Sequence, residues 1–410
     1  MLNTMRIPKR FLRFYFARHL LALFCLGLLS VATAHASEPE VLARKGIDQI
    51  LNLEMDGARR TFAELHTQYP QYPLFPFLDA SVYWAEAEVA QRNRDQLREL
   101  AIQQMLQAMT TANEQLAQDP QSAPWKLTRG MASFFAARMY ADKGRSISAY
   151  KFGRSGRDDL REVVAVNPEM NDAYLVLGMY EYIAGSIPRG LRWLAALFDL
   201  KGDRDLGVRY LERATSKARV MAPEAARMLL VAAGVQPETT RTCAYLELAK
   251  YMRKAYPRNP HYSVALQLIY VNCGYPQLAL AETDVAEKEF LEQFPNLKEE
   301  FEAIRLYAYR DLGKLSTVLS MKQKFEHDEA YWKIILAQTY DVLGQRKKAV
   351  ALYDEIYWAD LEGKTIETDS GPPADWIIDR ATRYRKQPYQ PGSLAKSNNG
   401  EPLQLNNQGQ

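Results

Sequence analysis

Histidine and cysteine are the residues of this chain that could carry nucleophilic or metal chemistry, and both are scarce. Beyond the first 36 residues the chain contains only His66, His261, His327, Cys243 and Cys273. No two of the histidines are four residues apart and no C-x-x-C pair occurs, so a zinc site has no local support. The sequence therefore predicts no resident metal and no cofactor.

A cysteine–histidine nucleophile is the one catalytic arrangement that the spacing leaves open, because Cys243, His261 and Cys273 fall in one expected helical hairpin. Such a nucleophile needs a base, a group that orients the base, and donors for the developing oxyanion. No residue pattern indicates the last two. The chain also has no nucleophile elbow, phosphate-binding loop or dinucleotide-binding loop. We therefore expect a protein without enzymatic activity.

The two cysteines are placed symmetrically about a turn. Cys243 and Cys273 each lie fifteen residues from position 258, inside the turn Pro257–Pro260. Two antiparallel helices that fold back about this turn bring equidistant positions side by side, which is the geometry that a disulfide requires. Export into an oxidising compartment would permit the bond. We predict a Cys243–Cys273 disulfide, and the alternative is a pair of buried free thiols.

The first 36 residues have the composition of a cleavable secretory signal. A basic leader without acidic residues is followed by an apolar run from Leu20 to Val31 and by the small-residue site Ala34-His35-Ala36. The apolar run is shorter than the roughly 20 residues that span a bilayer, although an uncleaved anchor remains the alternative. We predict cleavage before Ser37 and export, to the periplasm of a Gram-negative bacterium.

Removal of this leader reverses the sign of the net charge. The whole chain has 52 basic and 49 acidic residues, for a net charge of +3. The leader carries five of the basic residues and no acidic one, so 47 against 49 remain and the net charge becomes −2. Without an overall positive field, the mature chain is not expected to bind nucleic acid. A basic cluster from Arg138 to Arg157 could bind an anion, but nearby acids favour a solvated helix face.

Helices must position these residues, and one stretch shows how the helices repeat. In Ala330–Ile356, position 7 is a large residue and position 8 a small one, Leu336 and Ala337. Positions 11, 15, 20 and 24 are Tyr340, Gly344, Ala349 and Tyr353. This spacing closely resembles the tetratricopeptide repeat, in which small residues stand where two helices cross and large apolar residues lie between them. Related units begin near Pro39 and Asn171.

Proline-containing joints recur between these units, and a proline just past a helix end cannot continue the hydrogen-bond ladder. Alternating β-branched runs bounded by hairpin turns are absent from the sequence. We predict an all-α fold, a right-handed α-solenoid of about eight tetratricopeptide-like hairpins over residues 37–360, with two separate domains as the alternative. Residues 361–384 should form a capping segment. Residues 385–410, rich in Gln, Asn, Pro and Gly, should form a disordered tail.

One segment departs from the regular array. Apolar residues recur at helical spacing from Ile187 to Phe198, where only a loop is expected after Tyr182. We predict an inserted amphipathic helix over Pro188–Leu200, whose Trp193 packs against the neighbouring repeats. The alternative is peripheral contact with a membrane, to which the few basic residues of this segment would give little attraction.

The tetratricopeptide resemblance also implies a concave groove, lined by positions 2, 5, 9 and 12 of the first helix in each hairpin. In two of the units these positions are Asp172, Leu175, Met179, Tyr182, Tyr331, Ile334, Gln338 and Asp341. The set is apolar, aromatic and mildly acidic, unlike the Lys, Arg and Asn of the domains that clamp a C-terminal carboxylate. A stripe of this kind is also typical of the core between helices.

We therefore expect a non-enzymatic exported scaffold or adaptor that presents its groove to a protein partner in the cell envelope. Two alternatives stay open. One is a membrane-peripheral lipid-handling protein that uses the inserted helix, and the other is a non-catalytic subunit of an envelope enzyme.

Overall fold

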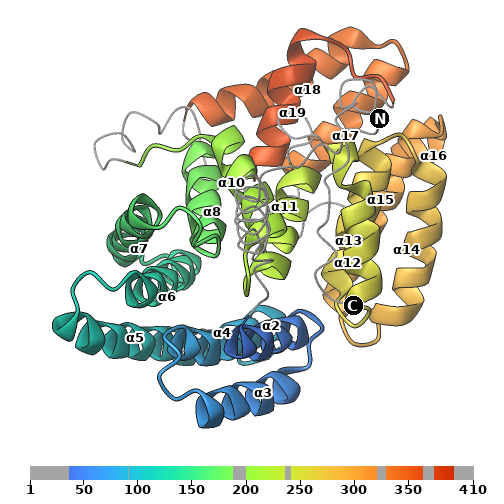
Figure 1. Cartoon of the computed structure of the whole chain (residues 1–410). Helices are drawn as coiled ribbons and strands as arrows, with labels where there is room; N and C mark the ends of the chain where they lie inside the picture. The colour runs from blue at the N-terminus through green and yellow to red at the C-terminus, as the bar shows by residue number, and fades with distance from the viewer. Residues whose placement is uncertain are drawn as a thin grey trace, which may run out of the picture. The chain divides into compact units, whose positions relative to one another are not determined.

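The computed structural model describes residues 37–90, 92–187, 200–235, 242–320, 329–362 and 374–391. Across these residues all regular elements are helical: there are seventeen α-helices and two short 3-10 helices, and no strand. Most helices pack against the next helix in the chain (Figure 1). The predicted all-α fold is confirmed.

The helices of the N-terminal half are α2 (Glu38–Leu51), α3 (Met55–Gln68), α4 (Phe75–Val89), α5 (Arg94–Gln118), α6 (Ala123–Asp142), α7 (Ser146–Val166) and α8 (Ala173–Gly185). They are followed by α10 (Arg204–Lys217), α11 (Ala222–Val235), η2 (Thr242–Tyr245), α12 (Leu246–Ala255), α13 (Pro260–Asn272) and α14 (Pro276–Phe290). The last elements are η3 (Pro295–Leu297), α15 (Lys298–Asp311), α16 (Leu315–Ser320), α17 (Glu329–Val342), α18 (Arg346–Leu361) and α19 (Ala374–Lys386). Connections of a few residues, as between α6 and α7, make such neighbours antiparallel.

Glycines let the helices of two pairs approach closely. A Cβ built on Gly156 of α7 would lie 2.6 Å from the carbonyl oxygen of Gly130 in α6. In the α8–α10 pair, a Cβ on Gly207 would lie 2.8 Å from the carbonyl oxygen of Gly178. These distances are too short for a real methyl group, so each crossing requires residues without side chains. Gly178 stands at position 8 of its sequence unit, where a small residue is expected.

Substitution of Gly156 by alanine is expected to lower the free energy of unfolding by about 1–3 kcal/mol, because the added methyl group must push α6 and α7 apart. Gly153, on the same helix, is a matched control, since a Cβ there would meet only the Cβ of Ala137, at 3.6 Å. Its replacement by alanine should be neutral or stabilise the helix by up to about 1 kcal/mol. Urea denaturation measures both variants, and equal stabilities would contradict the requirement for close approach.

Buried apolar side chains form two clusters that meet at α13. The first cluster runs from Ala43 in α2 to Cys273 after α13, and the second from Val264 in α13 to Tyr389 beyond α19. Tyr270 of α13 packs against both clusters. This helix therefore joins the N-terminal and C-terminal parts of the apolar interior.

Hydrogen bonds also join α2 to the turn before α13. Tyr256 Oη donates to Asp48 Oδ1 at 2.6 Å, and Asn259 Nδ2 donates to the carbonyl oxygen of Leu51 at 2.8 Å. Each bond connects residues that are 208 positions apart in the sequence. An array in which each repeat contacts only its neighbours does not predict these contacts.

The C-terminal helix, α19, extends beyond the predicted end of the capping segment. We expected the capping segment to end at residue 384, but α19 continues to Lys386 and Tyr389 is buried beyond it. Residues 385–391 therefore belong to the ordered fold, and the predicted tail is wrong over this stretch. The prediction relied on the average composition of residues 385–410, which does not reflect the one aromatic residue, Tyr389, that anchors the start of this stretch.

Polar contacts tie α19 to helices far from it in sequence. Asp379 forms an ion pair with Arg204 at the start of α10, and Arg380 donates to Asn272 Oδ1 of α13 at 2.7 Å. Arg380 is 4% exposed, so its contact with Asn272 lies in the interior. α19 is thus bonded to the middle of the chain as well as to α18.

Several predictions fall on residues outside the described part. These are the signal segment 1–36, His327, the tail from residue 392, and residues 188–199 of the predicted inserted helix with Trp193. Of the helices that the structure describes, none is long and apolar enough to cross a membrane.

Candidate functional site

Asp172, which the repeat pattern places in the groove, instead binds the backbone that leads into a helix of the next unit. Its carboxylate accepts backbone hydrogen bonds from Arg219 at 3.2 Å, Val220 at 3.0 Å and Met221 at 2.7 Å. These residues lead directly into α11, and their buried N–H groups need an acceptor because they lie outside regular secondary structure. Asp172 is 8% exposed, and burial raises the pKa of its carboxyl above the usual value. Its role in this structure is internal.

Replacement of Asp172 by alanine is expected to lower the free energy of unfolding by about 1–3 kcal/mol, because three backbone N–H groups lose their acceptor. Glu169 is a nearby control: its side chain is 73% exposed and pairs with Arg213 on the surface. Glu169→Ala should change stability by no more than about 0.5 kcal/mol. Thermal denaturation compares the two variants, and identical melting would show that these three hydrogen bonds do not stabilise the fold.

The other groove positions of the same unit lie in or against the core. Met179 is 6% exposed and Leu175 is fully buried, and both belong to the first apolar cluster. Tyr182 is partly buried and packs against that cluster. The predicted groove set is therefore wrong for Asp172, Leu175 and Met179, because these side chains fill the space between helices.

Two groove positions of the last unit, Gln338 and Asp341, belong to a buried polar network. Ile334 is fully buried, Gln338 accepts a hydrogen bond from Arg310, and the side chain of Tyr331 lies outside the described residues. Asp341 accepts hydrogen bonds from three groups, namely Arg346 Nη1 at 2.9 Å, Tyr353 Oη at 3.0 Å and the backbone N–H of Tyr389 at 2.8 Å. Tyr389 belongs to the chain's own C-terminal segment. The predicted groove is corrected here too, since residues of the same chain occupy it.

Arg310 and Asp311, at the end of α15, complete this network. Their side chains are 3% and 2% exposed, and Arg310 Nε lies 2.7 Å from Asp311 Oδ1. Arg310 Nη2 donates to Tyr389 Oη at 2.6 Å, and Tyr389 Oη donates to Asp311 Oδ1 at 2.7 Å. Burial raises the pKa of Tyr389 well above its usual value, so its phenol stays protonated and can donate. Sequence reasoning missed the network because no local pattern connects α15 with residue 389.

Cys243 in η2 and Cys273 after α13 form a disulfide with their Cα atoms 5.7 Å apart, as their placement predicts. With both sulfurs in this bond, neither is a thiolate that could attack a substrate. Desolvation and the charges of Arg227 and Arg94 lower the pKa of His261, which favours the neutral ring, and the residue lies at the surface. This geometry gives no support to a cysteine–histidine nucleophile.

Metal ligands do not converge in the described residues. No group of three His, Cys, Asp or Glu side chains there is arranged to hold a metal ion. His66 instead stacks on Phe75, with the ring centroids 4.3 Å apart. This histidine packs against an aromatic ring as a structural residue does.

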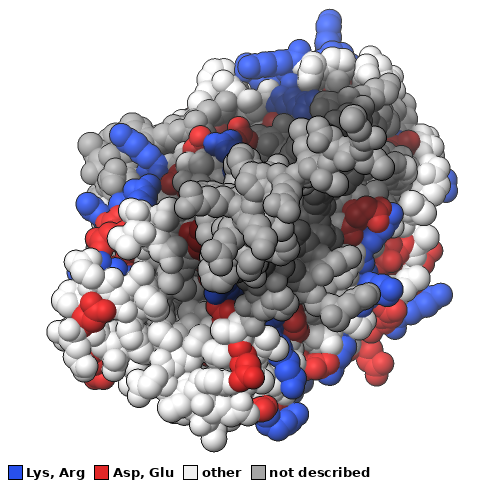
Figure 2. Space-filling model, in the orientation of Figure 1, with Lys and Arg blue, Asp and Glu red and all other residues white. Residues whose placement is uncertain are grey.

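The basic cluster on α6 and α7 is largely paired with acids. Five of its six basic residues form ion pairs at 2.6 to 3.8 Å: Arg138–Asp142, Lys143–Glu99, Arg145–Glu99, Arg154–Asp158 and Arg157–Asp158. Figure 2 shows basic and acidic side chains interspersed over the face in view. These pairs favour the solvated-face interpretation over a site for an anion or a lipid headgroup.

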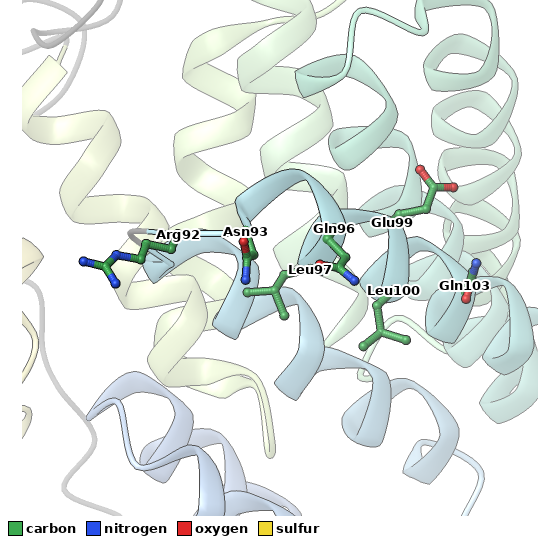
Figure 3. A pocket seen from close by; sticks show the side chains of 7 residues that line it. All are labelled: Arg92, Asn93, Gln96, Leu97, Glu99, Leu100 and Gln103. Atoms are coloured by element: carbon green, nitrogen blue, oxygen red, sulfur yellow. The ribbon is translucent and has the colours of Figure 1, made fainter.

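An open pocket of about 530 Å³ lies against the first turns of α5. It is lined by Arg92, Asn93, Gln96, Leu97, Glu99, Leu100 and Gln103 (Figure 3). These side chains face away from the buried positions of α5, Ala101, Met105, Ala108 and Ala112. Figure 3 shows Leu97 and Leu100 near one another with the amide side chains of Asn93 and Gln96 beside them, whereas Arg92 and Glu99 point away from the leucines.

The α5 pocket has the chemistry of a contact surface. Its titratable groups are Arg92 and Glu99, and a hydrogen bond from Lys143 lowers the pKa of Glu99, which is therefore held as a carboxylate. No nucleophile or acid–base pair lines the pocket. Two apolar side chains within a polar rim suit an apolar anchor from another molecule.

No protein-family model matches the chain, and comparison with curated proteins finds no match.

Proposed function

We propose that this chain is a non-enzymatic, exported scaffold or adaptor of the tetratricopeptide type, which binds a protein partner in the cell envelope. The observation that carries the proposal is the packing of successive antiparallel helices through small residues, at Gly130–Gly156 and Gly178–Gly207. Repeats built in this way leave helical faces exposed along the molecule, and proteins use these faces to bind other proteins. The secretory-signal composition of residues 1–36 supports the location.

The α5 pocket is the surface that we assign to the partner. Leu100 is 37% exposed and lies beside Leu97, in a rim of Gln96, Gln103 and Arg92. An apolar anchor surrounded by polar groups is the usual arrangement of a protein interface. The predicted groove residues are poorer candidates, because most of them are buried by contacts within the chain.

Affinity capture from envelope extract under mild crosslinking tests this function. The wild-type chain should retain a specific protein that Leu100→Arg loses, because a guanidinium cannot replace the apolar contact. Gln118→Arg, at the exposed C-terminal end of the same helix and outside the pocket, is the control and should retain it. Absence of any specific partner in the wild-type sample would contradict the proposed function. Equal capture by Leu100→Arg would place the contact on another surface.

A second exposed apolar face, on α14, could contact lipid under the lipid-handling alternative. Tyr275, Leu278 and Val285, at and along α14, are 47%, 48% and 45% exposed. The same helix carries Glu282, Asp284, Glu287 and Glu289, which pair with Arg253 and Arg305, so this face has no surplus of basic charge to attract an anionic membrane. We therefore expect the mature protein to remain in the soluble fraction when it is floated with vesicles of anionic phospholipid. Flotation with the vesicles would favour the lipid-handling alternative.

A further inference from the structure

The segment that follows α19 has one buried residue, Tyr389, which is held through its side chain and its backbone N–H. Tyr389 is 6% exposed, whereas the other residues from Lys386 to Pro391 are all exposed. Pro388 and Pro391 stand on either side of it and favour extended backbone over helix. Short peptides bind to proteins in this way, as extended chains with one buried aromatic anchor.

The surface that receives this segment forms hydrogen bonds with the phenolic oxygen of Tyr389, the one polar atom of its side chain. Arg310 donates to the phenolic oxygen at 2.6 Å, and the phenol donates to Asp311 at 2.7 Å. The guanidinium carbon of Arg310 also lies 4.2 Å from the ring centroid. Phenylalanine would keep the ring but leave both buried charged groups without their phenol contact, so the surface discriminates in favour of tyrosine.

Residues 386–391 leave two polar atoms of this surface without hydrogen bonds to the residues that the structure describes. Asp311 Oδ2 and Gln338 Nε2 are buried and make no hydrogen bond to any residue in the described part of the chain. Buried polar atoms without partners cost free energy. A ligand that adds one donor and one acceptor beside the tyrosine ring would fit the surface better than the present occupant.

We propose that Arg310, Asp311, Gln338 and Asp341 form a peptide-binding site for tyrosine, which residues 386–391 fill as a displaceable ligand in cis. The partner in trans is an extended peptide whose tyrosine offers a free hydroxyl and a backbone N–H, the two groups that the site contacts. This inference rests on the proposed function and adds a second surface, which stays closed until a partner peptide displaces Tyr389.

A labelled peptide with the sequence of residues 386–392, KQPYQPG, tests the site by fluorescence anisotropy with the full chain. Tyr389→Ala should bind the peptide, and the wild-type chain should bind it at least about tenfold more weakly because its site is already filled. A peptide with Phe in place of Tyr should bind Tyr389→Ala at least about tenfold more weakly. Gln390→Ala, an exposed neighbour of the anchor, is the control and should behave as the wild type.

A folded Tyr389→Ala chain that does not bind the peptide, or that binds the Tyr and Phe peptides equally, overturns the proposal. If circular dichroism shows that this variant does not fold, hydrogen exchange of the wild-type chain decides. The Tyr389 amide should then exchange at least about tenfold faster than the amides of Gln338 and Asp341 in α17, and equal rates overturn the proposal. The peptide assay contains no envelope partner, so a negative result there does not contradict partner binding at the α5 pocket. Failed capture together with positive peptide binding would contradict the proposed function alone.

Discussion

Reduction of the Cys243–Cys273 disulfide is expected to lower the free energy of unfolding by about 3–4 kcal/mol. The bond closes a loop that spans 30 residues and contains all of α12 and α13. Without the crosslink, the unfolded chain regains the conformational freedom of this loop, while the folded chain keeps its contacts. Urea denaturation with and without dithiothreitol measures the difference.

The double variant Cys243→Ala/Cys273→Ala is the control for effects of the reductant. It should have the stability of the reduced wild-type chain and should not respond to dithiothreitol. Intact mass after alkylation shows whether the bond forms in the native compartment. Two alkylated cysteines in an unreduced sample would mean that the chain is stabilised without the crosslink.

Substitution of Arg310 by methionine is expected to cost about 3–5 kcal/mol of stability. The change leaves the Asp311 carboxylate, whose side chain is 2% exposed, without its cation in the interior. It also removes a hydrogen-bond donor from Tyr389 Oη and from Gln338. Urea denaturation of the variant and the wild-type chain measures the loss.

Two variants show whether the lost charge causes this effect. Arg310→Met/Asp311→Leu removes both charges and should recover most of the stability, because no buried charge then remains unpaired. Lys250→Met breaks an ion pair with Glu247 whose side chains are 42% and 70% exposed, and should cost at most about 1 kcal/mol. A double variant no more stable than Arg310→Met would assign the loss to packing.

The features that the sequence predicted correctly depend on short stretches of chain. Helices follow from apolar residues at helical spacing, and each such stripe needs only its own ten to fifteen or so residues. The Cys243–Cys273 bond follows from the placement of both residues about one turn, so a single hairpin is enough to predict it. Gly178 was predictable as a crossing position for the same reason, since it belongs to a local repeat unit.

The groove was not predictable from the repeat pattern, because the pattern describes an ideal hairpin without its neighbours. Asp172 is turned inward by three backbone N–H groups from residues 219–221, and Asp341 by Tyr389. The partners lie 47 to 49 residues away from these carboxylates, outside the unit that defines the groove positions. A carboxylate on the expected concave face therefore serves equally well as an internal hydrogen-bond acceptor.

The hydrogen bonds between α2 and the residues at Tyr256 and Asn259 set an order of folding. Neighbouring helices close short loops and can form early, whereas α2 must wait for groups that lie 208 residues later. During synthesis from the N-terminus, α2 thus emerges first and can pack against α3, where Thr61 donates to Gln49, but it makes its hydrogen bonds with Tyr256 and Asn259 only after more than half of the chain has followed. Nascent chains that end before residue 256 should leave α2 open to protease, and chains that extend past α13 should protect it.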